Sequence, residues 1–410
     1  MVYQYHTFPN GIRIVHRYCD SYVSHCGIIV HAGSRDELDN EAGMAHFIEH
    51  TVFKGTHNRQ SYQILSHMEN VGGEINAFTT KEETCFYASF LNKYLERAID
   101  LLSDILFNST FPEKELEKEK DVVIDEINSY LDNPADEIFD EFEKLLFPNH
   151  SIGRYILGKP DLIMKFDERM IRKFIQRCYN TDEIVICSVG KIEFTKLVEI
   201  IGKYFSGIKP NRRKWKRSKF KGYKPFEKTV FKNTHQTHCL IGNVAYNNKD
   251  KRKNSLIMLN NILGGPGMNS RLNMNIREKY GFCYNIESNY TSFTDTGLFG
   301  IYMGTDNKNI EKTIHLVHKE LGKLRDVYMG VLQLQRAKRQ LIGQIAISYE
   351  QNLNEMLSMA KNYLVFNKVV TLEEINKQIE AITSQHLIET ANHIFDPKKL
   401  STLIFKSDKS

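Results

Sequence analysis

Residues 33–56 read GSRDELDNEAGMAHFIEHTVFKGT, and this stretch contains His46 and His50 with Glu49 between them. In an α-helix, residues i and i+4 lie on one face, so two imidazoles at this spacing reach the same metal ion. Glu49 follows His46 by three residues and shares that side of the helix. It can hold a water molecule against the metal and accept its proton, while the ion lowers the pKa of the water. The stretch therefore predicts a helix that carries a zinc site and a general base.

The surroundings of the two histidines argue against the plainer interpretation, a pair of solvent-exposed histidines on an amphipathic helix. Small and apolar residues surround them, namely Ala42, Gly43, Met44, Ala45, Phe47 and Ile48. A solvated helix face does not have this composition. We therefore expect the helix to be largely buried.

A catalytic zinc ion needs a third protein ligand. The acidic stretch 117–127, EKEKDVVIDEI, lies in a predicted helix over 113–131. Within it Glu119 and Glu126 are seven residues apart, which is about two helical turns, so both share one face. Helix geometry alone leaves open which of the two is the ligand.

The order of predicted elements recurs along the chain. In the first half we expect strands at 12–17, 25–31, 73–79, 84–90 and 183–189, and helices at 41–54, 62–71, 93–107, 113–131, 136–146, 168–177 and 194–205. In the second half we expect strands at 228–233, 237–244, 282–291, 297–303 and 400–405, and helices at 254–263, 270–279, several between 308 and 382, and 384–394. Strands mixed with groups of long helices predict an α+β fold made twice, each copy a mixed or antiparallel sheet covered by helices.

This recurrence predicts that the chain consists of two domains joined by a linker. Residues 1–206 are predicted to form an N-terminal catalytic, zinc-binding domain, and residues 228–410 a homologous C-terminal domain without a metal motif. Residues 207–227 include GIKPNRRKWKRSKFKGYK and are predicted to be a basic linker. A nucleic-acid-binding role for the linker is the alternative, but runs of charge are usually solvated surfaces.

Composition narrows the functional classes. The 410 residues include 55 basic and 50 acidic side chains, so the net charge of +5 is mild and predicts neither a nucleic-acid nor a membrane partner. No apolar run approaches the roughly 20 residues of a membrane span. The seven cysteines are odd in number and have no CxxC spacing, which favours a reducing, cytoplasmic location over a disulfide scaffold.

The stretch 33–56 and the stretch 72–90, GGEINAFTTKEETCFYASF, resemble the pitrilysin and insulinase family (M16) of inverted-zincin metallopeptidases. The resemblance covers nearly the whole chain, and the length is similar to the short branch, which includes mitochondrial processing peptidase subunits. It implies a zinc-dependent endopeptidase with one zinc ion per chain. The third ligand of the family lies 76 residues after the second histidine, which is Glu126 here. The supporting glutamate of the family corresponds to Glu119.

The resemblance also implies roles for residues far from the metal motif. The stretch 275–284, NIREKYGFCY, has Arg277 and Tyr284 at the spacing of the family's arginine and tyrosine, which donate hydrogen bonds to the substrate carbonyl. The strand at 73–79 resembles the edge strand that pairs with substrate, with Asn76 and Ala77 as the contact positions. An ordinary paired strand is the alternative there.

The resemblance finally implies partners. Peptides or extended polypeptide segments are the expected substrates, enclosed in a chamber made by two subunits. A homodimer is the simplest assembly because one chain carries both the metal motif and the Arg–Tyr pair; an inactive partner subunit is the alternative. A dedicated maturation protease for one precursor and a non-proteolytic scaffold subunit remain open as other functions.

Overall fold

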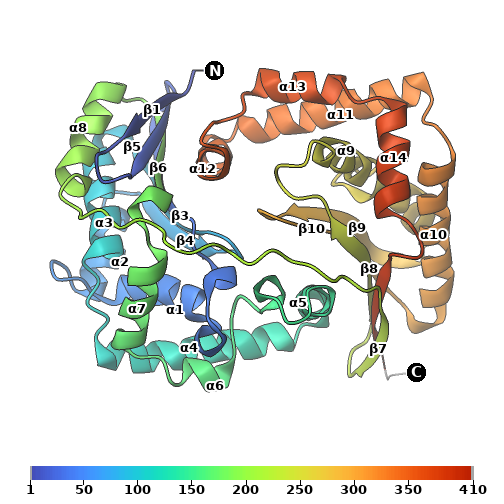
Figure 1. Cartoon of the computed structure of the whole chain (residues 1–410), viewed down its shortest axis with the longest axis horizontal. Helices are drawn as coiled ribbons and strands as arrows, with labels where there is room; N and C mark the ends of the chain where they lie inside the picture. The colour runs from blue at the N-terminus through green and yellow to red at the C-terminus, as the bar shows by residue number, and fades with distance from the viewer. Residues whose placement is uncertain (1, 408–410) are drawn as a thin grey trace. The chain divides into compact units, whose positions relative to one another are not determined.

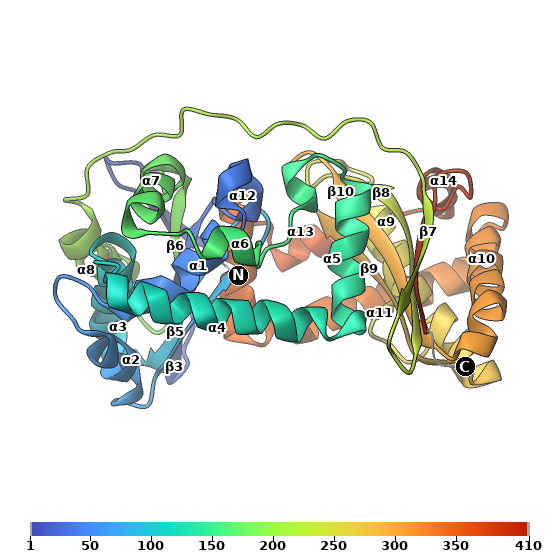
Figure 2. The ribbon, with the colours of Figure 1, turned by 90° about the horizontal axis from the view of Figure 1, so that it is seen from below.

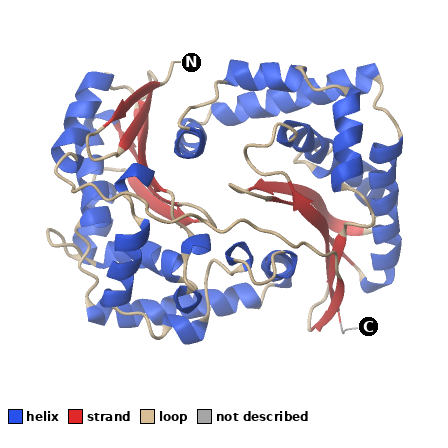
Figure 3. Ribbon diagram, viewed as in Figure 1, coloured by secondary structure: helices blue, strands red, loops and turns tan. Residues whose placement is uncertain are grey.

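The computed structural model describes residues 2–407, which form two β-sheets, each with its own helices (Figures 1 and 3). The strands are β1 (Gln4–Thr7), β2 (Arg13–Tyr18), β3 (Val23–Val30), β4 (Glu74–Thr79), β5 (Thr84–Leu91), β6 (Ile184–Gly190), β7 (Glu227–Lys232), β8 (Thr237–Ala245), β9 (Cys283–Ser292), β10 (Gly297–Thr305) and β11 (Ser401–Ser407). The α-helices are α1 (Met44–Thr51), α2 (Ser61–Glu69), α3 (Leu95–Phe107), α4 (Glu113–Leu131), α5 (Pro134–Leu146), α6 (Pro160–Ile163), α7 (Glu168–Cys178), α8 (Phe194–Phe205), α9 (Lys253–Gly264), α10 (Ile310–Asp326), α11 (Val331–Tyr349), α12 (Asn352–Phe366), α13 (Leu372–Glu380) and α14 (Ser384–Ile394). The predicted two-domain α+β fold is confirmed.

The first sheet has the strand order β1-β2-β6-β3-β5-β4. Strands β2 and β6 are parallel, and all other neighbours are antiparallel. The second sheet has the order β7-β11-β8-β10-β9, again with one parallel pair, β7 and β11, at the start. The last five strands of the first sheet and the five strands of the second therefore repeat one topology.

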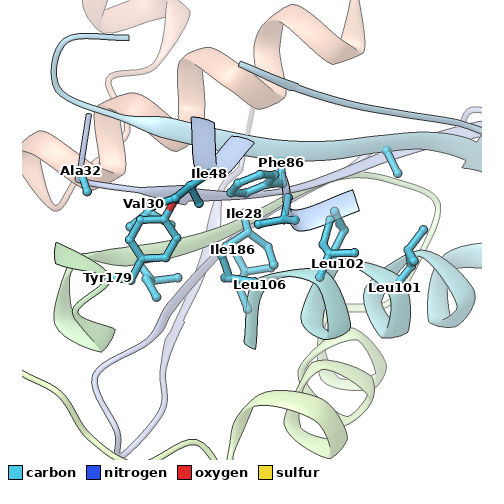
Figure 4. Close-up of a cluster of buried hydrophobic side chains, with 14 of the residues drawn as sticks. Ile28, Val30, Ala32, Ile48, Phe86, Leu101, Leu102, Leu106, Tyr179 and Ile186 are labelled. Carbon is cyan, nitrogen blue, oxygen red and sulfur yellow. The ribbon is translucent and has the colours of Figure 1, made fainter. Parts of the chain in front are cut away.

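Both faces of the central strands of the first sheet are buried, which explains their continuous apolar runs. All seven residues of β6 are buried. On one face, Ile186 packs with Ile28 and Phe86 against Leu102 of α3 (Figure 4). Val185 and Cys187, on the other face, pack against Met356 and Met359 of α12.

Each sheet is covered by a helix from the other half of the sequence. Helix α12 contacts β6, β3 and β2 of the first sheet. Helix α5 contacts β8 and β11 of the second sheet, where Ile138, Phe142 and Leu146 pack against Leu240 and Leu403. Because apolar strand faces are exposed to solvent only at a high free-energy cost, each exchanged helix completes a core.

The chain accordingly divides into two compact units. The first comprises residues up to Ile127, Arg154–Arg217 and Ala346–Leu372, and the second comprises Asn128–Gly153, Ser218–Ile345 and residues from Glu373 on. Each unit thus takes segments from both of the predicted ranges 1–206 and 228–410. One of the passages of the chain between the units, from Arg217 to Ser218, falls inside the predicted linker, which contains neither helix nor strand from 209 to 226 (Figure 2).

Some elements differ from the sequence-based expectations. Strand β1 lies before the first predicted strand and pairs with β2 across the turn at Gly11, whose φ is +100°. The α-helix expected over 41–54 is shorter, because Gly43 adopts φ +98° and begins α1 at Met44. The helix expected at 270–279 contains a π-helical segment, Asn273–Glu278.

Among the described residues, no helix combines the length and the hydropathy that crossing a bilayer would require. The seven cysteines are all free thiols, and six of them are buried.

Candidate metal centre

The start of α1 is defined by a left-handed glycine and a buried carboxylate. A Cβ atom on Gly43 would lie 2.9 Å from the Cα of Gly158, so a side chain at Gly43 meets both backbone strain and a steric conflict. The carboxylate of Glu37 accepts hydrogen bonds from the N–H groups of Gly43 (3.1 Å) and Ala45 (2.9 Å). Its two oxygens thereby satisfy N–H groups that the first turn of a helix leaves without a partner. Glu37 therefore anchors the helix that carries the histidines.

Helix α1 has one face in the core and another facing the site. Phe47 and Ile48 are fully buried in the core of the first unit. His46, Glu49 and His50 are on the site side, with His46 buried and the other two partly buried. The short helix is thus fixed by apolar packing on one side and leaves three chemically active side chains on the other.

Helix α4 supplies the acidic side of the site. Its buried residues include Leu116, Val123 and Ile127, an apolar stripe that orients the helix against the core. Glu119 and Glu126 flank this stripe two turns apart. The Glu119 side chain is 6% exposed, whereas that of Glu126 is 44% exposed.

His46, His50 and Glu126 bring three ligand atoms together within 4.8 Å of one another. Oε2 of Glu126 lies 3.7 Å from Nε2 of His46 and 3.4 Å from Nε2 of His50. Ligand atoms around a tetrahedral zinc ion are separated by about 3.3 Å, given Zn–N and Zn–O bonds of about 2.0–2.1 Å. Two imidazoles and one carboxylate also match the donor set of catalytic zinc. The three side chains therefore fit a zinc ion without a large movement.

The two histidines differ in their protonation, and that of His46 suits metal binding, which requires a neutral imidazole. Burial and, after it, the charge of His50 lower the pKa of His46 to about 3, so its imidazole is neutral at neutral pH. Burial disfavours charge on His50 as well. The hydrogen bond with Glu119 and the charge of Glu126 outweigh burial there and raise the pKa of His50.

His50 is held from behind. Its Nδ1 lies 2.9 Å from Oε1 of Glu119, and the other oxygen of Glu119 lies 2.6 Å from Nζ of Lys54. Histidine ligands commonly donate their second ring N–H to a carboxylate, which fixes the tautomer and the ring orientation. The contact with Glu119 gives the His50 ring this support and leaves Nε2 of His50 free to bind a metal. Nδ1 of His46 is buried and has no hydrogen-bond partner among the described residues.

Glu49 is positioned by the adjacent edge strand. The hydroxyl of Thr79, the last residue of β4, donates to Oε2 of Glu49 at 2.5 Å. Burial raises the pKa of Glu49, and the hydrogen bond from Thr79 opposes this shift only in part. A carboxylate with a raised pKa is a stronger base, as a general-base role requires.

Strand β4 is an edge strand, since it pairs with β5 alone among the described strands. Asn76 is opposite Tyr87 and Ala77 is opposite Phe86. Asn76 is exposed, and its Oδ1 accepts a hydrogen bond from the N–H of Ala77 at 2.8 Å. Thr79 and Glu49 join this edge to the metal centre.

Arg277 and Tyr284 lie in the second unit. Arg277 is exposed in the π-helical segment and donates to Oδ1 of Asn273 at 3.3 Å. Tyr284, near the start of β9, is 64% exposed. Both side chains are therefore accessible to a ligand, as their predicted roles require.

Sequence reasoning missed three supporting residues, namely Glu37, Lys54 and Thr79. Lys54 lies inside the stretch 33–56 and Thr79 inside the stretch 72–90, on which the family resemblance rests. Lys54 contacts Glu119 of α4, and Thr79 of β4 contacts Glu49 of α1. These contacts join segments that are distant in sequence, so no local pattern encodes them.

Two family models match the chain. The model described as insulinase (peptidase family M16) matches residues 14–160, and the model described as the M16 inactive domain matches residues 165–341. A zinc protease of Bacillus subtilis, YmxG, is 33% identical, and the alignment covers 98% of each chain. A zinc protease of Rickettsia felis is 31% identical over 97% of this chain and 96% of its own.

Solved structures show the same fold. A protease from Helicobacter pylori superposes with a TM-score of 0.91 at 22% identity and covers 99% of both chains. A structure from Pseudomonas fluorescens, described as a peptidase M16 inactive domain, has a TM-score of 0.92 at 20% identity and covers 100% of this chain and 99% of that one.

Proposed function

The chain belongs to peptidase family M16, and on this premise we propose that it is a zinc-dependent endopeptidase with Glu49 as its general base. The observation that carries the proposal is the convergence of Nε2 of His46, Nε2 of His50 and Oε2 of Glu126 beside Glu49. We propose that these three atoms hold one zinc ion per chain. When bound, zinc supplies Lewis-acid polarisation of the peptide carbonyl and lowers the pKa of water.

Glu49 is proposed to move the proton. Its carboxylate would accept a proton from the attacking water and then donate it to the nitrogen of the departing amine. Burial raises the pKa of Glu49 above its ordinary value, which makes its carboxylate a stronger base and supports this exchange. Thr79 holds one carboxylate oxygen and leaves the other available to water.

Substrate is proposed to bind along β4 as an added strand. An exposed sheet edge pairs with an extended peptide through main-chain hydrogen bonds and places little demand on its sequence. Asn76 and Ala77 lie on this edge, and Thr79 brings its end to Glu49. For this pairing the Asn76 side chain must release the N–H of Ala77.

Arg277 and Tyr284 are proposed to donate hydrogen bonds to the substrate carbonyl. A guanidinium and a phenol are suitable donors for an oxygen that gains negative charge in the transition state. Their exposure in the second unit supports this role.

A homodimer is the proposed assembly, with an inactive partner subunit as the alternative. One chain has all the proposed site residues, which supports the homodimer. Sedimentation velocity of the pure protein at micromolar concentration is expected to give a mass near twice that of one chain. A monomer that becomes active only after addition of a second protein would favour the alternative.

The proposed location of the protein is the cytoplasm. Its cysteines are free thiols, which supports a reducing compartment.

The test of the proposed function uses the purified chain and a quenched fluorogenic peptide library. We expect about one zinc ion per chain, cleavage that stops when a chelator removes the metal, and recovery when zinc is added back. Zinc-loaded protein that cuts no library peptide would contradict a general endopeptidase. Cleavage of one precursor alone would restrict the proposal to a dedicated maturation protease.

A further inference from the structure

The linker lies on the first unit in an extended conformation over residues 211–217. Burial alternates along this segment: Asn211, Arg213, Trp215 and Arg217 are partly buried, whereas Arg212, Lys214 and Lys216 are exposed. A period of two is that of an extended chain with one side against a surface. The basic run therefore contains two kinds of cation, one facing the protein and one facing solvent.

Arg217 makes the most extensive contacts of the inward-facing side chains. Its guanidinium donates to both carboxylate oxygens of Asp36, at 2.8 and 2.7 Å, and to the backbone carbonyl of Glu82 at 2.8 Å. The side chains are 8% exposed for Arg217 and 0% for Asp36. A buried, bidentate arginine–carboxylate pair has a fixed geometry, unlike a solvated ion pair.

The first segment that Arg217 contacts leads to the metal helix. Asp36 precedes Glu37, and the Glu37 carboxylate binds the N–H groups of Gly43 and Ala45 at the start of α1. Asp36 is thus adjacent in sequence to the group that anchors the helix of His46 and His50.

The second segment leads to the general base. Glu82 lies in the turn between β4 and β5, and the same turn begins one residue after Thr79, which binds Glu49. The two segments also meet directly, because the N–H of Ser34 donates to the carbonyl of Thr80 at 3.1 Å and the N–H of Arg35 to that of Lys81 at 2.8 Å. Arg217 spans this junction.

We propose that Arg217 is a positioning residue for the metal centre. By bonding to Asp36 and to the Glu82 carbonyl together, it holds the loop that anchors α1 and the turn that holds Glu49 in one arrangement. The inference rests on the proposed function, since it concerns the same zinc site. Arg217 contacts none of the proposed metal ligands. It also contacts His31, the residue after β3, through the ring Nε2 at 2.6 Å and the backbone carbonyl at 3.2 Å. Its proposed effect on the metal centre is exerted through Asp36 and Glu82.

The test compares three substitutions in the full chain. Arg217→Gln removes the inward cation, and Lys216→Gln removes the outward cation next to it. Arg17→Gln breaks another buried ion pair of the same unit, Arg17–Glu355 at 2.6 Å, on the sheet face covered by α12. It therefore controls for general destabilisation. For each variant, zinc affinity is measured by chelator competition, folding by circular dichroism and thermal melting, and kcat and KM by peptide cleavage.

We expect folded Arg217→Gln to bind zinc on the order of 10-fold more weakly and to lose kcat with little change in KM, whereas the two control variants keep wild-type zinc affinity. Arg217→Lys should not restore affinity, because an ammonium lacks the planar fork. Wild-type zinc affinity and kcat in folded Arg217→Gln, or an equal loss in Arg17→Gln, would overturn the proposal.

If Arg217→Gln fails to fold, a double variant tests the proposal instead. The double variant Asp36→Asn/Arg217→Gln removes both charges and leaves no buried carboxylate alone. Weaker zinc binding in this variant supports the proposal, and wild-type affinity overturns it. If the wild type binds zinc but cuts no peptide, the proposed function fails, while the zinc affinities still decide the role of Arg217.

Discussion

His50 lies between two glutamates of α4, with Glu119 at 2.9 Å from its Nδ1 and Glu126 at 3.4 Å from its Nε2. Each carboxylate faces a different ring nitrogen. Only Glu126 also approaches Nε2 of His46. The geometry therefore favours Glu126 as a metal ligand and Glu119 as the group that orients His50.

Substitutions of these glutamates should separate the two roles. Glu126→Gln removes a ligand charge and is expected to abolish stable zinc binding. Glu119→Gln should weaken zinc binding by about 10- to 100-fold, the usual effect of losing a group that orders a ligand. Asp125→Asn, an exposed neighbour on the same helix, is the matched control and should keep wild-type affinity. Equal zinc affinities for Glu119→Gln and Glu126→Gln in chelator competition would contradict this division.

The hydroxyl of Thr79 should matter for turnover rather than for metal binding. Thr79→Val removes the hydrogen bond to Glu49 with little change in shape, so kcat is expected to fall by about 10-fold while zinc content stays at the wild-type level. Thr79→Ser keeps the hydroxyl and should recover most of the activity. Steady-state kinetics with metal analysis of the same samples checks both, and unchanged kcat in Thr79→Val would remove this residue from the account.

Edge-strand binding along β4 predicts an alternating effect of backbone methylation in the substrate. N-methylation at residues whose N–H faces β4 removes a main-chain hydrogen bond and should raise KM at least several-fold. Methylation at the neighbouring residues, whose N–H groups face away, is the control and should have little effect. Equal KM values across a methylation scan on both sides of the cleaved bond would exclude strand pairing.

Asp104 should contribute to stability in a pH-dependent way. Its carboxylate accepts hydrogen bonds from Thr56 (2.7 Å), Asn58 (2.6 Å) and Arg59 (2.6 Å). Burial alone would raise the pKa of Asp104, but these hydrogen bonds outweigh burial and lower it. The charge therefore stabilises the fold above the unfolded-state pKa of about 4, and this contribution is lost as the pH falls through the lower folded-state value.

Asp104→Asn is accordingly expected to reduce the free energy of unfolding by about 1–3 kcal/mol at pH 7. The difference from the wild type should shrink below pH 4. Urea unfolding at both pH values measures it. Asp100→Asn, whose side chain is 32% exposed, should show a smaller effect at pH 7. A difference that grows on acidification would contradict the assignment.

The parts of the fold that local patterns encode could be predicted from the sequence. The predicted range 113–131 matches α4, and 384–394 matches α14, because each has clear helical periodicity and boundaries. No local sequence pattern indicates that α5 covers the second sheet or that α12 covers the first sheet. Either helix buries its apolar face equally well against any complementary sheet, so only the assembled cores determine its position.

For the metal site too, local spacing predicts only part of the arrangement. The spacing of His46, Glu49 and His50 predicted one helix face, and the structure brings Glu126 to it. Helical spacing could not choose between Glu119 and Glu126, since both share a face; the choice came from the family resemblance, and the distances agree with it. The roles of Glu37 and Arg217 depend on loop contacts between segments up to about 180 residues apart, which periodicity cannot reveal.

The central claim is that Glu49 performs the chemistry and His46, His50 and Glu126 hold the metal. The most direct measurement is zinc content and peptide cleavage of the wild type and Glu49→Gln, side by side. We expect about one zinc ion per chain in both proteins, with cleavage in the wild type and a loss of at least about 1000-fold in the variant. Cleavage by Glu49→Gln at close to the wild-type rate, with zinc retained, would contradict it.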